Sequence, residues 1–507
     1  MLETIEQAIK PHDNYQIEMK LDYQLVKGQK THYRVSTFFF VPQSLGIDAA
    51  TYIKSDFYRD IQTYIRLKTP TLILREFTEN SASPLVSASR ICTVEGWTNK
   101  PECRARLINS FKLLAAMLKS SYREHLNLIH RRIAEAAPDS KIHVMIRNLV
   151  DEFLIETQKI TKEFRSLYPV VNLPNVDDTI FAAYKFTDES ISLLIEESAA
   201  DMFVIVGDHL KKADRIDFNR RLCELVKHET THRKSHGYPS ILSENSDNEE
   251  YEYRTSVLKK YAASVLYLST AVHREGTTLE QVLFAVAAGV SMGFATVIAF
   301  YFQSQYGNFT FAFFVALVVG YMFKDRMKES GRGLFAKYLQ NTLYDRRITI
   351  RSQDGQHKLG ILREKVSFVD EQDVPRPVLK ARNLQHIANI DNDWRGERII
   401  RYSKEIVLYK NAFDGIFGDT DTPQLTGIND IMRYDIRSYL RKMAEPLTVR
   451  RSLNCNELRT FTCHKVYHLD VVSRYRSIMP HKEKIHRRVR LVLDRKGIKR
   501  IEHIDGV

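Results

Sequence analysis

The chain has 507 residues, 44% hydrophobic and 27% charged, a composition that is typical of folded domains and excludes wholesale disorder. Its five scattered cysteines form no C-x-x-C pair, which argues against a disulfide framework or a cysteine-rich zinc module. The formal net charge of +13 belongs to the C-terminal third, because residues 324–507 hold 38 Lys+Arg and 24 Asp+Glu. We expect an acidic partner to meet that part.

The first hundred residues are predicted to form an α/β region that contains a β-hairpin. Apolar side chains alternate from Tyr15 to Leu25 and again from Tyr33 to Val41, with the connection VKGQK between the two runs. This period of two with a glycine in the connection is typical of paired strands. Residues 1–10 carry acids and no apolar stretch, so no cleaved secretion signal is expected.

Residues 101–278 are predicted to form a cytosolic helical bundle. Apolar residues recur at spacings of three and four, as in the run from Leu107 to Ile133 and the run from Ile142 to Leu167. Further stripes follow near 178–211, 214–235 and 249–272. Long amphipathic helices with short connections favour a bundle, whose last helix is expected to lead into the membrane.

One motif in this bundle has the spacing of a zinc-protease helix. His228-Glu229-Thr230-Thr231-His232 is H-E-x-x-H, in which both histidines lie on one helix face and Glu229 could act as general base. His236 is one turn further and could add a ligand. These four side chains are the candidates for a zinc site and a membrane-bound metallopeptidase.

The same stretch also reads as an ordinary helix end, and we favour this interpretation. His232, Arg233, Lys234 and His236 precede Gly237 and Pro239. Cations in the last turn complement the helix dipole, glycine suits the C′ position and proline cannot continue the helix. We therefore expect no catalytic site and no cofactor, with zinc as the alternative.

Residues 279–323 are predicted to form a transmembrane helical hairpin. Residues 282–302 are uncharged and would span about 31 Å as a helix, whereas the second run, 309–323, would span roughly 22 Å. Arg274 precedes the first run and Lys324 follows the second, while QSQYGN between them is uncharged. The positive-inside rule then places both termini in the cytosol, and a bacterial inner membrane is the expected location.

Both apolar runs contain small residues at every fourth position, which lets helix backbones approach closely. Packing of the hairpin on itself is the simpler explanation, and homo-oligomerisation is the alternative. The residues are Ala285, Gly289 and Gly293 in the first run and Ala312, Ala316 and Gly320 in the second.

The C-terminal third is predicted to hold a juxtamembrane amphipathic helix over 324–345 and a basic, β-rich cytosolic domain over 346–507. Asp354-Gly355 indicates a hairpin turn, and one helix is expected near 427–443. Residues 474–500 hold eleven Lys+Arg and two acids. The cations expected to bind an anionic surface are Arg487, Arg488, Arg490, Lys499 and Arg500.

The sequence therefore predicts an α+β membrane protein with two passes, acting as a scaffold, sensor or partner-binding protein rather than an enzyme. Its partners are expected to be the lipid bilayer, anionic lipid or an acidic protein, and nucleic acid is not excluded. A zinc metallopeptidase is one alternative. The other is an oligomeric protein that forms pores or perturbs membranes, although neither apolar run contains an ionisable residue.

Overall fold

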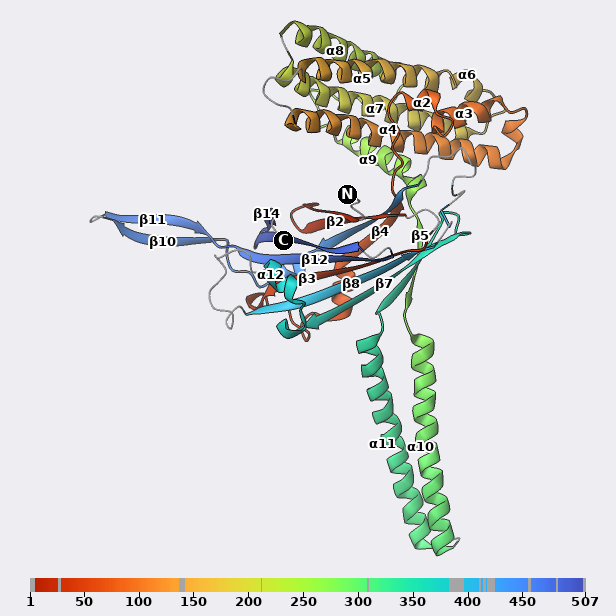
Figure 1. Ribbon diagram of the computed structural model, residues 1–507, viewed down its shortest axis with the longest axis vertical. Coiled ribbons are helices and arrows are strands. Elements are labelled where there is room, and N and C mark those ends of the chain that lie inside the picture. Colours follow the sequence, from red (N-terminus) through yellow and green to blue (C-terminus); the bar gives the residue numbers. More distant parts are fainter. Residues whose placement is uncertain are drawn as a thin grey trace. The chain divides into compact units, whose positions relative to one another are not determined.

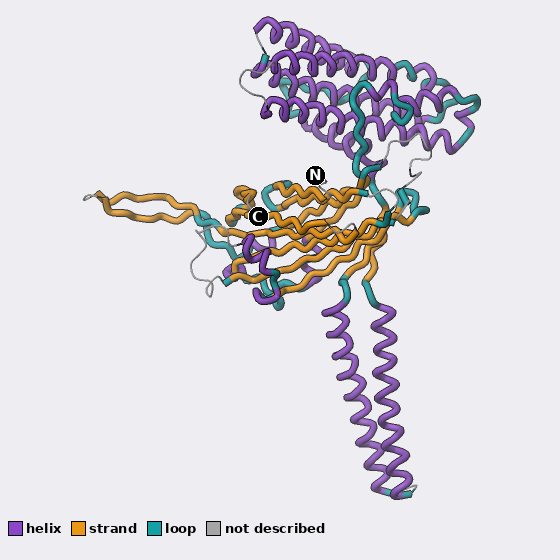
Figure 2. Tube along the Cα trace, in the orientation of Figure 1, coloured by secondary structure: helices purple, strands orange, loops and turns teal. Residues whose placement is uncertain are grey.

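The computed structural model combines helical and β-sheet regions, 53% helix and 27% strand, so the chain is a mixed α+β protein as predicted (Figure 2). It divides into two compact units: unit 1 comprises residues 1–64, 269–412 and 430–507, and unit 2 comprises 65–268 and 413–429. The structure describes residues 5–25, 29–135, 142–210, 212–307, 310–382, 396–409, 412–413, 416, 425–454, 457–479 and 482–504.

Unit 1 is built on an eight-stranded antiparallel sheet (Figure 1). The strand β3 (Thr31–Pro42) lies inside this sheet, where Phe39 pairs with Val471 of one neighbour and with Ile400 of the other. The strand order is β14 (Gly497–Ile504), β13 (Lys482–Asp494), β12 (Tyr467–Met479), β3, β8 (Glu397–Leu408), β7 (Lys358–Val369), β6 (Arg346–Arg351) and β5 (Ser269–Arg274).

A second sheet contributes to the same core, and it corrects the predicted N-terminal β-hairpin. Its order is β1 (Ile5–Pro11), β2 (Gln16–Gln24), β9 (Gly427–Asp435) and β4 (Ile61–Leu67). The two predicted strands therefore exist as β2 and β3 but belong to different sheets. Met19 of β2 and Phe39 of β3 are buried in one core. Alternation indicates which face of a strand is buried, but it does not identify the strand's partner.

Two further expectations for the C-terminal third have different outcomes. The turn at Asp354-Gly355 is confirmed, because it joins the antiparallel pair β6–β7 and Gly355 has φ 75°. The helix expected over 427–443 is wrong: β9 occupies most of it, followed by the single turn α13 (Arg437–Leu440). Tyr434 and Tyr439 are fully buried, so tertiary packing outweighs the helical pattern.

Short elements complete unit 1. They are α1 (Lys54–Asp60), α12 (Arg376–Arg382), the 3-10 turns at Gln43–Leu45 and Glu371–Asp373, and the two-stranded ribbon β10 (Leu447–Asn454) and β11 (Glu457–His464). The helix α12 packs on β12 and β13. Because the core of β13 lies on its other face, this strand is covered on both sides.

Unit 2 is the predicted helical bundle, in which long helices lie side by side (Figure 1). Its core is aromatic and aliphatic; the rings of Phe164 and Tyr184 stack with centroids 4.8 Å apart, and Phe111 packs edge-on against both. The helices are α4 (Pro101–Glu135), α5 (Ile142–Arg165), α7 (Asp178–His209), α8 (Lys212–Ser235) and α9 (Glu249–Ala263). Shorter elements are α2 (Glu76–Glu79), α3 (Pro84–Thr93), α6 (Tyr168–Val171) and the 3-10 turns Trp97–Asn99 and Ser264–Leu266.

The first and last residues of the bundle lie next to each other in space. The amide of Leu268 donates to the carbonyl oxygen of Ile65 at 3.1 Å, and Arg66 and Tyr267 form an antiparallel bridge. The helical region is thus an insertion between strands of unit 1. The boundaries expected at residues 100 and 278 lie instead near 64 and 268, since helical periodicity does not reveal that β5 follows the bundle.

The helices α10 (Thr277–Tyr306) and α11 (Phe311–Thr342) form an antiparallel pair. A Cβ built on Gly320 would lie 3.5 Å from Ile298, and one on Gly331 would lie 3.2 Å from Ala287. The helix α11 continues through the segment expected to be a separate amphipathic helix at 324–345. Within the described part of the chain, α10 is the one helix that is long and apolar enough to cross a membrane.

Candidate functional site

The H-E-x-x-H motif lies at the C-terminal end of α8, where a capped helix end is confirmed. The helix stops at Ser235 and Gly237 takes φ 67°. The amide of Tyr238 donates to the carbonyl of Arg233 at 3.0 Å, and the amide of Gly237 donates to that of Lys234 at 3.2 Å. This pair of bonds is the Schellman arrangement, in which glycine adopts the left-handed conformation at C′.

Glu229, the candidate general base, is engaged in a buried ion pair. Its side chain is 1% exposed, and Arg165 of α5 donates to its two carboxylate oxygens at 3.0 and 2.6 Å. Burial would raise the pKa of Glu229, but the hydrogen bonds and charge of Arg165 outweigh it and leave the pKa lowered. A carboxylate held in this way faces an arginine rather than a metal-bound water.

His232 belongs to the same network, through Asp188 of α7. Its Nε2 lies 2.7 Å from Asp188 Oδ2, while Arg165 and Tyr238 donate to the same carboxylate at 3.0 Å each. Burial would raise the pKa of Asp188, but the hydrogen bond from His232 and the charge of Arg165 more than offset it, so that the pKa is lowered. The histidine nitrogen that could bind zinc therefore faces a carboxylate acceptor.

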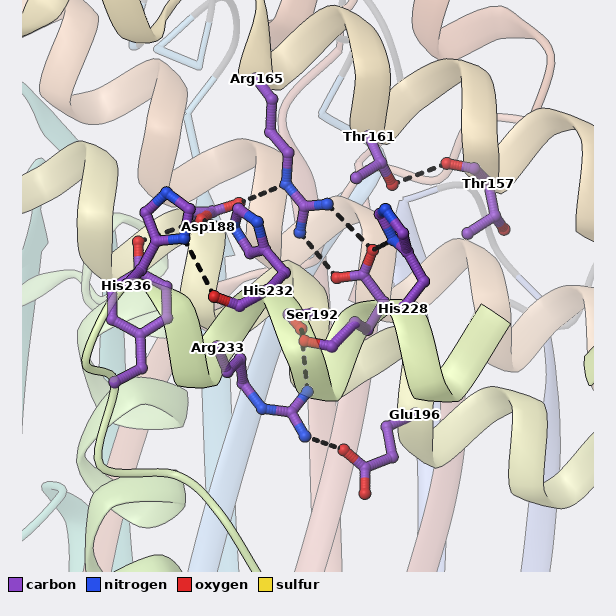
Figure 3. Close-up of polar contacts among 12 residues, drawn as sticks. Thr157, Thr161, Arg165, Asp188, Ser192, Glu196, His228, His232, Arg233 and His236 are labelled. Atoms are coloured by element: carbon purple, nitrogen blue, oxygen red, sulfur yellow. Dashed lines mark hydrogen bonds and ion pairs between the residues drawn. The ribbon is translucent and has the colours of Figure 1, made fainter. Parts of the chain in front are cut away.

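The remaining histidines of the motif lie at the edge of the same network (Figure 3). His228 Nδ1 is 3.4 Å from Glu229 Oε1, and the ring centroid of His236 is 4.0 Å from that of His232. The side chain of His228 is 72% exposed. The Nδ1 atom of His236 lies 2.9 Å from the carbonyl oxygen of His232. Among the residues that the structure describes, no group of three or more His, Cys, Asp or Glu side chains is placed to hold a metal ion.

Two more arginines extend the network along α7. Arg233 is buried, donates to Ser192 Oγ at 2.8 Å and to the carbonyl of Ser240 at 3.1 Å, and pairs with Glu196. Arg254 of α9 pairs with the fully buried Glu189 at 2.6 Å. Each of these ion pairs joins α7 to a neighbouring helix, so together with Arg165 the network links α7 to α5, α8 and α9. Sequence reasoning selected the histidines and missed Arg165, Asp188 and Glu189, which interrupt otherwise apolar stripes.

The basic stretch of β13 requires a correction, because two of its five candidate cations are buried. Arg488 donates to Asp470 Oδ1 at 3.0 Å and Arg490 donates to the same oxygen at 3.2 Å. Burial lowers the pKa of Arg488, against the opposing effect of Asp470. Both side chains were expected to bind an anionic surface, but α12 covers this face of the strand. Arg487, Lys499 and Arg500 are exposed, and Arg500 pairs with Glu502 at 2.8 Å.

The two small-residue stripes have different places in the helical hairpin. Ala316 and Gly320 of α11 are buried against α10. The stripe of α10 is exposed, and a Cβ built on Gly289 or Gly293 would meet nothing within 4 Å. Ala285 and Ala312 are exposed as well. Packing within the hairpin therefore accounts for Ala316 and Gly320 of the second stripe and for no residue of the first.

No protein-family model, no curated protein and no solved structure matches this chain, so its function rests on the geometry described above.

Proposed function

We propose that this protein is an integral membrane protein whose α10–α11 hairpin anchors a scaffold, with both soluble units on the cytosolic side. The observation that carries the proposal is the exposed apolar surface of α10. Val297 is 67% exposed and Phe300 is 66% exposed, and most other large side chains of this helix are also exposed. Soluble surfaces rarely expose continuous apolar patches of this kind, whereas a bilayer would cover them.

The register of the hairpin bears on how deeply it would insert. Since Ala287 faces Gly331 and Ile298 faces Gly320, the first half of the apolar run of α10 lies beside the charged part of α11. That part contains Lys324, Asp325, Arg326, Lys328, Glu329 and Arg332. The uncharged segment of α11 is Phe311–Phe323, which spans roughly 20 Å of a hydrocarbon core about 30 Å thick.

Energetics favour keeping these charges out of the hydrocarbon. A charged residue at the centre of a membrane helix costs about 3 kcal/mol, so the six would cost on the order of 15–20 kcal/mol. Leaving about six apolar residues of α10 at headgroup level forfeits only ~3 kcal/mol on the same scale. Two full crossings are the expectation from hydropathy; the register favours an alternative in which the hairpin enters from the cytosolic side and ends within the bilayer.

Labelling of a single cysteine tests both the cytosolic placement of the soluble units and the depth to which the hairpin inserts. In a variant without native cysteines, Gly307→Cys is exposed to a membrane-impermeant maleimide on intact cells, with Gln356→Cys as the cytosolic control. Labelling at 307 alone in intact cells supports two crossings. Labelling at neither site in intact cells, with only Gln356→Cys labelled after permeabilisation, supports the one-sided hairpin. Labelling of Gln356→Cys in intact cells would contradict the cytosolic placement. Release of the protein from membranes by alkaline carbonate would overturn the anchor itself.

We also propose that the exposed cations of β13 and β14 contact anionic lipid. Each cation near an anionic surface contributes roughly 1 kcal/mol to binding, so Arg487, Lys499 and Arg500 together would contribute roughly 3 kcal/mol. A fragment covering 346–507 would lack the central strand β3, so the full chain is needed. Hydrogen exchange of β14 should slow in nanodiscs with phosphatidylglycerol compared with phosphatidylcholine, and the triple Gln variant should remove the difference. Tight binding to RNA with no lipid effect would contradict this proposal.

A further inference from the structure

A second site lies within unit 2, on a hollow between α4, α7 and α9. The cavity has a volume of about 390 Å³ and also borders the end of β4. This lies within the range of small-molecule pockets, roughly 300–1,000 Å³. All of its lining residues fall between Arg66 and Tyr267, so the site is complete within the helical insertion.

The charge around this hollow is strongly unbalanced. Five cations and one carboxylate line it, namely Arg66, Lys119, Arg123, Lys259 and Lys260 with Glu197. Within the described residues, no ion pair joins any of these cations to a carboxylate. Desolvation and the nearby charge of Lys259 lower the pKa of Lys119, against the opposing charge of Glu197. Four of these cations, Lys119, Arg123, Lys259 and Lys260, are exposed, and an anion bound among them would relieve their mutual repulsion.

The same cavity is also lined by a buried polar atom that has no hydrogen-bond partner in the regions that the structure describes. The Nε atom of Arg66 is buried and has no hydrogen-bond partner in the described structure. Buried donors are normally satisfied, so unpaired ones in a pocket indicate where a ligand atom belongs. An arginine and lysines beside a hydroxyl are the groups that bind phosphate oxygens.

The floor of the hollow is aliphatic. Ala115, Leu193, Leu258, Ala262 and Leu266 line it and are buried. Tyr267, the one aromatic lining residue, is exposed at 39%. A nucleobase would favour an aromatic stacking partner, whereas an alkyl chain suits a floor of alanine and leucine.

We propose that this hollow binds a phosphate monoester that carries an aliphatic chain, with the phosphate between Arg66, Lys119 and Lys259 and the chain on the leucine floor. Both a lipid headgroup and a free alkyl phosphate have this chemistry. The site is independent of the membrane hairpin, and its ligand would make unit 2 the sensing part of the protein.

Calorimetry on the full chain in nanodiscs of phosphatidylcholine tests the proposal, with butyl phosphate, inorganic phosphate and dihexanoyl phosphatidic acid as probes. Butyl phosphate should bind at least tenfold more tightly than inorganic phosphate, and binding should weaken as salt is added. Tighter binding of the phosphatidic acid than of butyl phosphate identifies a lipid headgroup as the source, and the reverse identifies a free alkyl phosphate. Failure of both to bind overturns the proposal.

A charge-matched pair of variants provides the control. Lys119→Gln with Lys259→Gln should weaken butyl phosphate binding at least tenfold, whereas Lys162→Gln with Lys227→Gln, which removes two exposed cations elsewhere on the bundle, should change it less than twofold. Because the first pair relieves repulsion, its melting temperature should stay the same or rise. Equal losses of binding in the two pairs would overturn the assignment of the site.

Discussion

Replacing Arg165 by alanine should destabilise the helical bundle strongly, because it removes the arginine that two buried carboxylates share. Glu229 is 1% exposed and Asp188 is 2% exposed, and Arg165 donates to both. Removing one partner of a buried ion pair typically costs about 3–5 kcal/mol. Asp188 retains His232 and Tyr238, so we expect the lower half of this range.

A surface pair provides the matched control. Arg221 pairs with Asp151 at 2.6 Å, and both side chains are about one-third exposed. Exposed pairs contribute roughly 0–1 kcal/mol, so Arg221→Ala should have little effect. Both ion pairs join α5 to α8: Arg165 and Asp151 belong to α5, and their partners Glu229 and Arg221 belong to α8. The two variants therefore affect the same pair of helices.

Hydrogen exchange is the appropriate assay, because a chain with two units does not unfold in one step. The free energy of opening for amides in α5 and α8 should fall by about 3 kcal/mol in Arg165→Ala and by less than ~1 kcal/mol in Arg221→Ala. A double variant, Arg165→Met with Glu229→Gln, should recover part of the loss by removing a buried charge. Equal small effects of the two single variants would refute the reasoning that burial makes the Arg165 network strong.

Three further predictions follow from the same network and from the course of the chain. Purified protein should contain well under one zinc per chain by elemental analysis, and stoichiometric zinc lost in His232→Ala would show that the helix-end interpretation is wrong. The lowered pKa values of Asp188 and Glu229 mean that these groups stabilise the bundle above their unfolded pKa values, near 4, and that this contribution is lost as the pH falls further. Circular dichroism melts from pH 7 to 2 should show this loss, and a smaller one in Glu229→Gln; a loss on raising the pH from 7 would contradict it. Because the insertion begins and ends at the Ile65–Leu268 contact, a fragment of residues 65–268 should fold alone with a helical spectrum and a cooperative melt, and a disordered fragment would contradict the division into units.

The sequence predicts the helices well, since each long stripe corresponds to a helix in the bundle. Leu107, Phe111 and Leu114 have one reason to recur at this spacing, which is burial on one face. Sheet membership could not be predicted in this way. The strand β3 pairs with β8 and β12, and nothing in residues 31–42 identifies partners so distant in the sequence.

In the candidate site as well, local features could be predicted from the sequence, whereas contacts between distant segments could not. The C-terminal cap at Gly237 is local and was predictable, whereas the partner of Glu229 is Arg165, on another helix. The burial of Arg488 and Arg490 depends on α12 and Asp470, which come from other parts of the chain. The hollow lined by Lys119 and Lys259 was not predicted either, because its cations are spread over α4 and α9.

The position of β3 has a consequence for how the protein is made. Its last residue is Pro42, while its partner strands begin at Glu397 and Tyr467. At 5–20 residues per second, a ribosome needs roughly 20–70 s to produce the first partner after β3 has emerged. Throughout this time Phe38, Phe39 and Phe40, which are buried in the finished sheet, have no partner strand. Both the bundle and the α10–α11 hairpin are synthesised within this interval. The side chains that β3 buries in the finished sheet therefore wait for strands from the C-terminal third, and the hairpin is synthesised before the sheet can close.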